Sequence, residues 1–435
     1  MTLVLAFLIR LVLMSITLHG DLLFTNYFPY FLSTKGVWDI YGYFGDHYLK
    51  LYGYTYYAPL NYYLVGGAQW LLKGFAYGFG GFMEHIHAIL YRGAGGNLGE
   101  YLASFSEPDI RRWIFWMKFP YLIADALCLF VIAKIYAGNA VRRKALILWC
   151  FHPILLFSVY VFGTYRIYPA FVMLCVVYWV RQGNKTLASL ALGTLCLMDN
   201  FPWLLLPSSV LILGVTWRER LKLFCLMMIA FSLLFIPLYV HSHGYVRYAY
   251  LSPIFARFAV RSLTRQFAPM VAAAAKSLFV IIYGGVIYFL WSRKRKASES
   301  AKDTAGLFVR VNAAVLLLFY ATSQTPAHYF MWVLPLFVMM QAEGEPWRPW
   351  LSWVLIGLLL LFNLDSRQLN LGLFLPVLPD AFSYPSLHEI LAQWVPWGKV
   401  VASARLIFSG ISLYFVWRII NSGDDVLLRF RRGIG

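Results

Sequence analysis

Apolar runs long enough to cross a lipid bilayer recur along this chain from Leu3 to Ile420. A helix needs about 20 apolar residues to span the hydrocarbon core. Dividing the runs at polar and basic breaks gives twelve candidate spans, at residues 3–19, 113–136, 145–162, 167–181, 186–199, 202–217, 221–240, 269–291, 305–323, 328–342, 349–363 and 399–420. Only 13% of the residues are charged, roughly half the share in soluble domains. The sequence therefore predicts an all-α polytopic membrane protein with about 12 transmembrane helices.

The charge of the chain marks its orientation in the membrane. Lys and Arg outnumber Asp and Glu by 37 to 19, but the basic residues sit in short loops between the apolar runs, which argues against a nucleic-acid partner. With the N-terminus inside, the positive-inside rule places five basic clusters in the cytoplasm. They lie at residues 142–144, 181–185, 218–222, 293–296 and 429–432. The short loops favour a bacterial or archaeal plasma membrane over the endoplasmic reticulum.

We expect one transmembrane domain over residues 1–435, with external segments at 20–112, 241–268 and 364–399. The apolar stretch Pro59–Phe82 is assigned to the outer surface as an interfacial or re-entrant helix pair. A further span there would reverse the side of every later basic loop, although insertion of this stretch remains an alternative. A first external segment this long favours a functional role for it.

A single carboxylate, Asp21, directly follows the first apolar run in the sequence His19-Gly20-Asp21. Half-buried against a helix bundle, such a carboxylate has the raised pKa that suits a general base. The alternative is that Asp21 only caps an interfacial helix that begins at Leu22. Both interpretations stay open from these residues alone.

Two further carboxylates, Asp39 and Asp46, lie in a strongly aromatic segment that contains Tyr56 and Tyr57. Sugars stack their C–H faces on aromatic rings and donate hydroxyl hydrogens to carboxylates, so this composition suits the binding of a sugar or an acceptor. Tyr and Trp are also enriched wherever a protein meets the membrane interface, and an aromatic belt is the alternative interpretation.

A basic stripe is expected on the second external segment, because Arg257, Arg261 and Arg265 are spaced by four residues. Cations kept on the outer side oppose the positive-inside rule, and binding of an anion such as a lipid phosphate explains them. Snorkelling to anionic headgroups is the alternative.

Other charges fall within the apolar spans. Four cations lie in their outer third or in an outer turn: Lys118, Lys276, Arg405 and Arg166. Charged groups inside a span are by default functional and face the bundle interior. Arg10 and Asp125 lie deeper, and a structural ion pair between the first two spans is expected for them.

The sequence supports neither a metal site nor a cofactor. Glu84, His85 and His87 resemble metal ligands, but their spacing matches no known ligand pattern. No phosphate-binding loop, dinucleotide fingerprint or nucleophile elbow is present. We therefore expect chemistry that needs neither a metal nor a cofactor.

Taken together, these residues follow a familiar order. A carboxylate after the first span, an aromatic loop that ends at Tyr54–Leu60, the turn Phe162-Gly163 and the late motif Pro326–Pro335 resemble the GT-C class of integral-membrane glycosyltransferases. The nearest likeness is to enzymes that use a polyprenyl-phosphate mannose donor. The resemblance implies inverting transfer of a sugar, such as mannose, to a lipid or glycan acceptor on the outer or lumenal face. It implies Asp21 as the base, and His328 and Tyr329 as groups that meet the donor phosphate.

The chain departs from that class at two positions. Many members have Gly-Gln-x-Asp where this sequence has Gly163-Thr164-Tyr165-Arg166, and a lysine before a proline is replaced by Asp199-Asn200. The donor phosphate is then left to His328, Tyr329, Arg166 and the basic stripe. A secondary transporter or flippase of a lipid-linked or small anionic substrate is the alternative function, although no paired halves are visible in the sequence.

Overall fold

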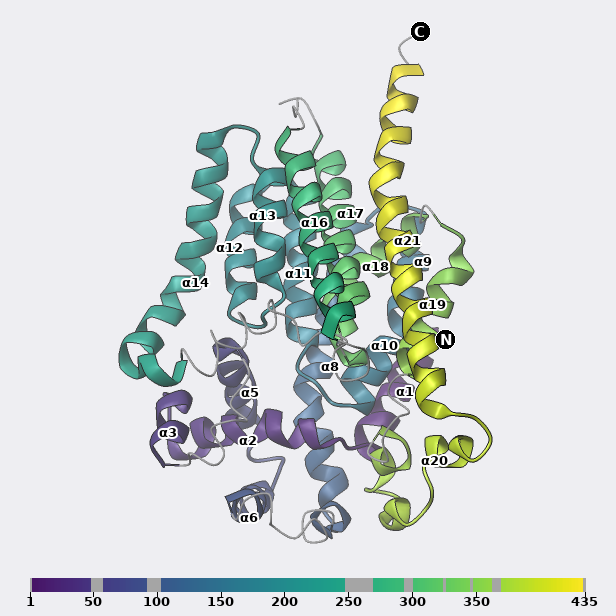
Figure 1. Ribbon diagram of the computed structural model, residues 1–435. Coiled ribbons are helices and arrows are strands. Elements are labelled where there is room, and N and C mark those ends of the chain that lie inside the picture. The colour runs from purple at the N-terminus through teal and green to yellow at the C-terminus, as the bar shows by residue number, and fades with distance from the viewer. Residues whose placement is uncertain are drawn as a thin grey trace.

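The computed structural model describes residues 2–47, 58–91, 103–246, 269–292, 300–323, 326–344, 347–361 and 369–432. Every regular element within these ranges is a helix, as expected. Figure 1 shows two parts, an upright helix bundle and a layer of helices across one end of it. The buried apolar residues form one continuous core, whose members range along the sequence from Met14 to Ile419.

The bundle contains a helix or helix series at every expected span. Its helices are α1 (Thr2–Ile16), α8 (Ile110–Ile135), α9 (Val141–Phe151), α11 (Ile167–Arg181), α12 (Lys185–Cys196), α13 (Pro202–Leu213), α14 (Trp217–Val246), α16 (Pro269–Ser292), α17 (Ala301–Thr322), α18 (Leu334–Glu343), α19 (Pro349–Leu361) and α21 (Trp397–Arg432).

Not all of these helices are full spans. In the described residues, five candidate spans are long and apolar enough to cross a membrane alone, or six if a bent helix pair counts as one. α12 and α13 have 12 residues each, which corresponds to about 18 Å of helix against a hydrocarbon core of about 30 Å. Each of the twelve expected spans therefore coincides with an apolar helix or helix series, but only five or six in the described residues have the length of a full span.

Two expected spans are also broken locally. Within 145–162, α9 stops at Phe151, and the chain continues through α10 (Pro153–Leu155) and a π-helix at Leu156–Val161. Pro153 cannot donate a backbone hydrogen bond and forces His152 into an extended conformation. Within 328–342, a 3₁₀ helix at Ala327–Trp332 precedes α18. Both irregular segments contribute residues to the candidate site.

The layer at the end of the bundle begins where α2 (Gly20–Lys35) turns away from α1 by 80°. Beside α2 lie α3 (Ile40–His47), α5 (Pro59–Leu72) and α6 (Phe79–Tyr91) (Figure 1). α5 and α6 form the helix pair expected near 59–82. The same end carries α20 (Leu387–Ala392) and the short 3₁₀ helices Leu371–Phe374 and Pro379–Phe382, whereas another, Ser104–Ser106, precedes α8.

Buried polar contacts hold the bundle helices together where they meet this layer. The Arg10 Nε atom lies 2.6 Å from Asp125 Oδ2, which confirms the pair expected between the first two spans. Asp125 also accepts hydrogen bonds from the Trp149 indole and the Tyr160 hydroxyl, each 2.6 Å long. Lys118 Nζ donates to the carbonyl oxygens of Thr17 and Tyr160, also at 2.6 Å. These contacts join the end of α1 to the π-helix.

Candidate functional site

Asp21 lies in the first turn of α2, directly after the bend from α1. His19 is the N-cap of α2, because its Nδ1 atom accepts the Asp21 backbone N–H at 3.1 Å. The cap role considered for Asp21 therefore belongs to His19. The Asp21 side chain is 40% exposed, with Oδ1 3.7 Å from His19 Nδ1. Its carboxylate is thus half-buried and accessible at the end of the bundle that carries the helix layer.

Three stacked rings connect the start of α2 to the 3₁₀ helix at Ala327–Trp332. The His19 ring stacks on Phe162 with 3.7 Å between ring centroids. Phe162 in turn stacks on His328 at 4.2 Å. The next residue, Gly163, has φ of +82° and packs its backbone against Leu22 of α2. This left-handed turn positions Phe162 between the two histidines.

Arg166 is the second charged group of the site. Its guanidinium carbon lies 3.8 Å from the centroid of the Tyr329 ring, and its Nε atom lies 3.8 Å from Asp199 Oδ2. Both side chains of this ion pair are only 4% exposed. The Trp332 indole N–H donates to the same Asp199 oxygen at 2.8 Å. The Arg166 cation is therefore held in a nearly dry environment beside an aromatic face.

The structure thus brings Asp21, His328, Tyr329 and Arg166 into one connected region. A half-exposed carboxylate lies at one side, and an imidazole and a guanidinium lie beyond the Phe162 ring. A carboxylate of this kind accepts a proton, and preorganised cations stabilise an anion that develops nearby. This combination is suited to a group transfer with an anionic leaving group.

The remaining cations expected inside the spans have different positions. Lys118 is fully buried and joins α8 to Thr17 and Tyr160, as described above. Arg405 on α21 donates to the Ser323 carbonyl at 2.9 Å, just beyond the end of α17. The side chain of Lys276 lies outside the described residues.

Asp39 lies in the helix layer, just before α3, and is buried. Its Oδ1 atom accepts the Gly42 backbone N–H at 3.0 Å, and its Oδ2 atom accepts the Ser242 hydroxyl. Asp39 therefore joins α3 to the end of α14. Asp46 is exposed at the end of α3.

Five candidate residues fall outside the described residues. They are Tyr56, Tyr57, Arg257, Arg261 and Arg265. Their roles in acceptor or phosphate binding stay predictions.

The potential metal ligands Glu84 and His87 on α6 contact α2. Glu84 Oε1 lies 2.9 Å from Lys35 Nζ and accepts the Tyr30 hydroxyl at 3.2 Å. The hydrogen bond from Lys35 holds the pKa of Glu84 below its usual value. His87 contacts the Tyr27 hydroxyl, and partial burial lowers the pKa of its imidazole. These contacts tie α6 to α2.

No role was expected for His19 or Phe162, although both stand in motifs that were singled out, His19-Gly20-Asp21 and Phe162-Gly163. The pairing of Asp199 with Arg166 was not expected either. These motifs pointed to the right segments of the chain. The stacking of residues 19, 162 and 328, however, depends on the break in the span at Pro153 and on the 3₁₀ helix.

Comparison with known proteins gives little further information. No family model and no curated protein matches the chain. Among solved structures, the crystal structure of ArnT from Cupriavidus metallidurans bound to undecaprenyl phosphate is similar, with 12% sequence identity, a TM-score of 0.45, and coverage of 98% of this chain and 78% of that chain. A TM-score this low does not establish a shared fold.

Proposed function

We propose that this protein is a membrane glycosyltransferase of the GT-C type. In this proposal it transfers a sugar, mannose first among the candidates, from a polyprenyl-phosphate donor to a hydroxyl of a lipid or glycan acceptor on the outer face. The observation that supports it best is the stack of His19, Phe162 and His328, with the Asp21 carboxylate 3.7 Å from the His19 ring nitrogen. A base and a phosphate-binding group then lie in one region, as the sequence resemblance implies.

Asp21 is the proposed general base. An acceptor hydroxyl is a weak nucleophile, so a carboxylate must take its proton while the oxygen attacks the anomeric carbon. The half-exposed position of Asp21 permits access by an acceptor. The new bond forms on the face opposite the leaving phosphate, which inverts the anomeric configuration.

His328, Tyr329 and Arg166 are the proposed donor-phosphate groups. The bond from the anomeric carbon to the phosphate oxygen breaks as negative charge grows on the lipid phosphate. A buried cation close to that oxygen stabilises this charge more strongly than it would in water. The basic stripe Arg257, Arg261 and Arg265 and the acceptor-binding role of Asp39, Asp46, Tyr56 and Tyr57 remain parts of the proposal.

A reconstitution experiment separates this proposal from the transporter alternative. Purified protein in proteoliposomes receives radiolabelled polyprenyl-phosphate mannose together with a membrane glycolipid extract. The proposal predicts a new covalent mannolipid and an equal amount of released polyprenyl phosphate. Movement of the labelled lipid across the bilayer without a covalent product would instead support the flippase function.

A further inference from the structure

A cavity with a volume of about 290 Å³ lies between α2, α5, α6 and α8, and Asp21 does not line it. Asn26 lines it from α2, five residues after Asp21. Five residues of helix correspond to a rotation of about 140° from the direction of Asp21. The cavity is therefore distinct from the base and opens on another side of the outer layer.

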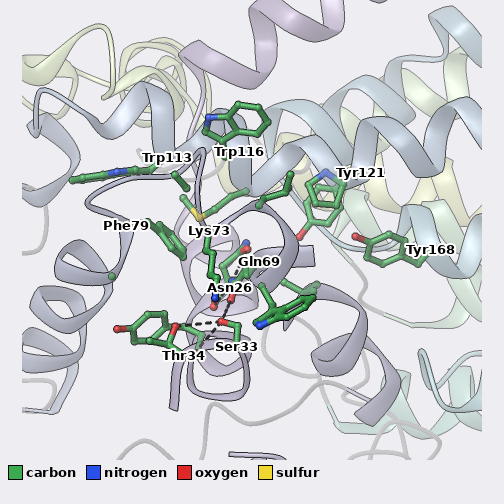
Figure 2. A pocket seen from close by; sticks show the side chains of 18 residues that line it. Asn26, Ser33, Thr34, Gln69, Lys73, Phe79, Trp113, Trp116, Tyr121 and Tyr168 are labelled. Atoms are coloured by element: carbon green, nitrogen blue, oxygen red, sulfur yellow. Dashed lines mark hydrogen bonds between the residues drawn. The ribbon is translucent and has the colours of Figure 1, made fainter. Parts of the chain in front are cut away.

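One end of the cavity is aromatic. Trp113, Trp116 and Phe79 lie together there, as Figure 2 shows. Phe82 stacks on Trp113 at 4.6 Å between ring centroids and supports its orientation. Flat aromatic walls of this kind bind the C–H faces of sugar rings as well as other apolar groups.

The opposite end is polar but carries no acid. Gln69 donates to both the backbone oxygen and the side-chain oxygen of Asn26, at 2.8 and 3.1 Å, and accepts the Ser33 hydroxyl at 3.1 Å (Figure 2). Among the described residues that line the cavity, Lys73 is the one with a charged side chain. Lys73 is exposed at the rim, 5.6 Å from the ring centroid of Trp70. Neutral amides and hydroxyls match a hydroxyl-rich ligand better than a phosphate, which attracts several cations.

Tyr121 forms part of the cavity wall and is fully buried. Its hydroxyl has no solvent-accessible surface and lies next to the Asn26 side chain. Tyr121 therefore shapes the cavity, and the polar groups that a ligand can reach are those of partly exposed side chains such as Gln69 and Ser33.

The surroundings of the cavity indicate how the ligand arrives. Large apolar side chains beside it are strongly exposed, at 55% for Trp70, 70% for Leu71 and 62% for Phe75. An exposed apolar surface on an interfacial helix pair faces lipid. A ligand that enters from there carries an apolar tail.

We infer that this cavity binds the sugar headgroup of a glycolipid that enters from the outer leaflet. The sugar ring lies between Trp113, Trp116 and Phe79, and its hydroxyls meet the Gln69 amide and the Ser33 hydroxyl. That the bound glycolipid serves as the acceptor rests on the proposed function. Binding itself does not depend on it.

Photolabelling tests the inference on the full chain in phosphatidylcholine nanodiscs. The two probes are an octyl glucoside and an octyl phosphocholine with the same diazirine in the chain, and labelled peptides are mapped by mass spectrometry. We expect the glucoside to label residues 65–80 and 113–121 more than the phosphocholine does, and excess unlabelled octyl glucoside to prevent it. Equal labelling by both probes, or none in these peptides, would overturn the inference.

Three variants make the assay specific. Gln69→Leu removes the hydrogen-bonding amide of the polar end and is expected to weaken glucoside labelling about tenfold. Ala76→Phe places a large ring in the wall of the cavity and is expected to abolish labelling. Gln393→Leu makes the same chemical change as Gln69→Leu at an exposed glutamine that does not line the cavity, so it serves as the control. Labelling that is insensitive to both cavity variants would contradict the inference.

The assay contains no sugar donor, so the two proposals fail separately. Glucoside binding without any transfer from polyprenyl-phosphate sugars would leave the cavity assigned and reject the proposed function. Transfer that depends on Asp21 without glucoside binding would do the reverse.

Discussion

Arg166 and Asp199 face each other across the candidate site, with 3.8 Å between Nε and Oδ2 and only 4% exposure of each side chain. These are the two positions at which the sequence departs from the GT-C pattern, where an acid and a lysine are common. The two departures therefore meet in space, and together they form one buried ion pair.

The ion pair predicts a specific pattern of stability. Asp199→Ala leaves the Arg166 cation buried without its partner and removes the acceptor of the Trp332 indole, at an expected cost of about 3–5 kcal/mol. Arg166→Asp should cost a similar amount. The double variant Arg166→Asp/Asp199→Arg should recover part of the loss, and the recovery is incomplete because the Trp332 N–H then faces a cation. Thermal unfolding in detergent measures each variant, and simple additivity of the single effects would contradict the prediction.

Lys118 is expected to stabilise the two chain segments that carry His19 and Phe162. Its ammonium donates to the carbonyl oxygens of Thr17 and Tyr160, which stand two residues before His19 and Phe162. Lys118→Met removes these donors and leaves the buried Thr17 carbonyl without its side-chain donor, at about 1–3 kcal/mol, whereas the Tyr160 carbonyl still accepts the Thr17 hydroxyl. Sugar transfer should fall more than with Lys144→Met, a control at an exposed position in the first turn of α9. Equal stability and transfer in the two variants would show that Lys118 has no such role.

Two glycines allow a matched test of the turn beside Asp21. Gly163 and Gly138 both have left-handed φ angles, of +82° and +71°. A Cβ atom at Gly163 would lie 3.0 Å from Leu22 Cδ1, whereas one at Gly138 would meet nothing within 4 Å. Both changes to Ala strain the backbone, but Gly163→Ala should be more destabilising by about 1–3 kcal/mol because it also overpacks. Unfolding temperatures that shift equally would count against a tight contact with α2.

The attachment of α6 to α2 should weaken in acid. The folded pKa of Glu84 is lowered, chiefly by the Lys35 hydrogen bond, so its contribution is present above the unfolded carboxyl pKa and is lost as the pH falls through the folded value. The folded pKa of His87 is lowered by burial, so protonation in the unfolded segment reduces stability once the pH falls below about 6.5. A fall in pH therefore weakens the attachment of α6 through both groups.

Hydrogen exchange of residues 79–91 at pH 7 and pH 4, corrected for the intrinsic exchange rate at each pH, measures this effect. We expect lower protection factors at pH 4, and a smaller decrease in Glu84→Gln. Because the Glu84 side chain is 44% exposed, its share is small. Equal protection factors at the two pH values would mean that other contacts hold α6.

Much of the fold followed from hydrophobic patterning, because long apolar runs such as 301–322 have few structures open to them in a bilayer. The Arg10–Asp125 pair was predictable since two buried charges need each other. The unequal helix lengths were not predictable, because the residues that flank α12 and α13 in the sequence are as apolar as the helices themselves. Contacts such as His19 with Phe162, or Gln69 with Asn26, depend on tertiary placement that no local pattern encodes.

The most direct test of the central claim is single-turnover transfer from polyprenyl-phosphate mannose by wild type, Asp21→Asn and Asp380→Asn, each at equal amounts in lipid. Asp380 is an exposed carboxylate in the 3₁₀ helix Pro379–Phe382 and controls for the change itself. Loss of a general base typically slows a reaction about 10²–10⁴-fold. The account predicts that loss in Asp21→Asn and wild-type turnover in Asp380→Asn. Wild-type turnover in Asp21→Asn would contradict it.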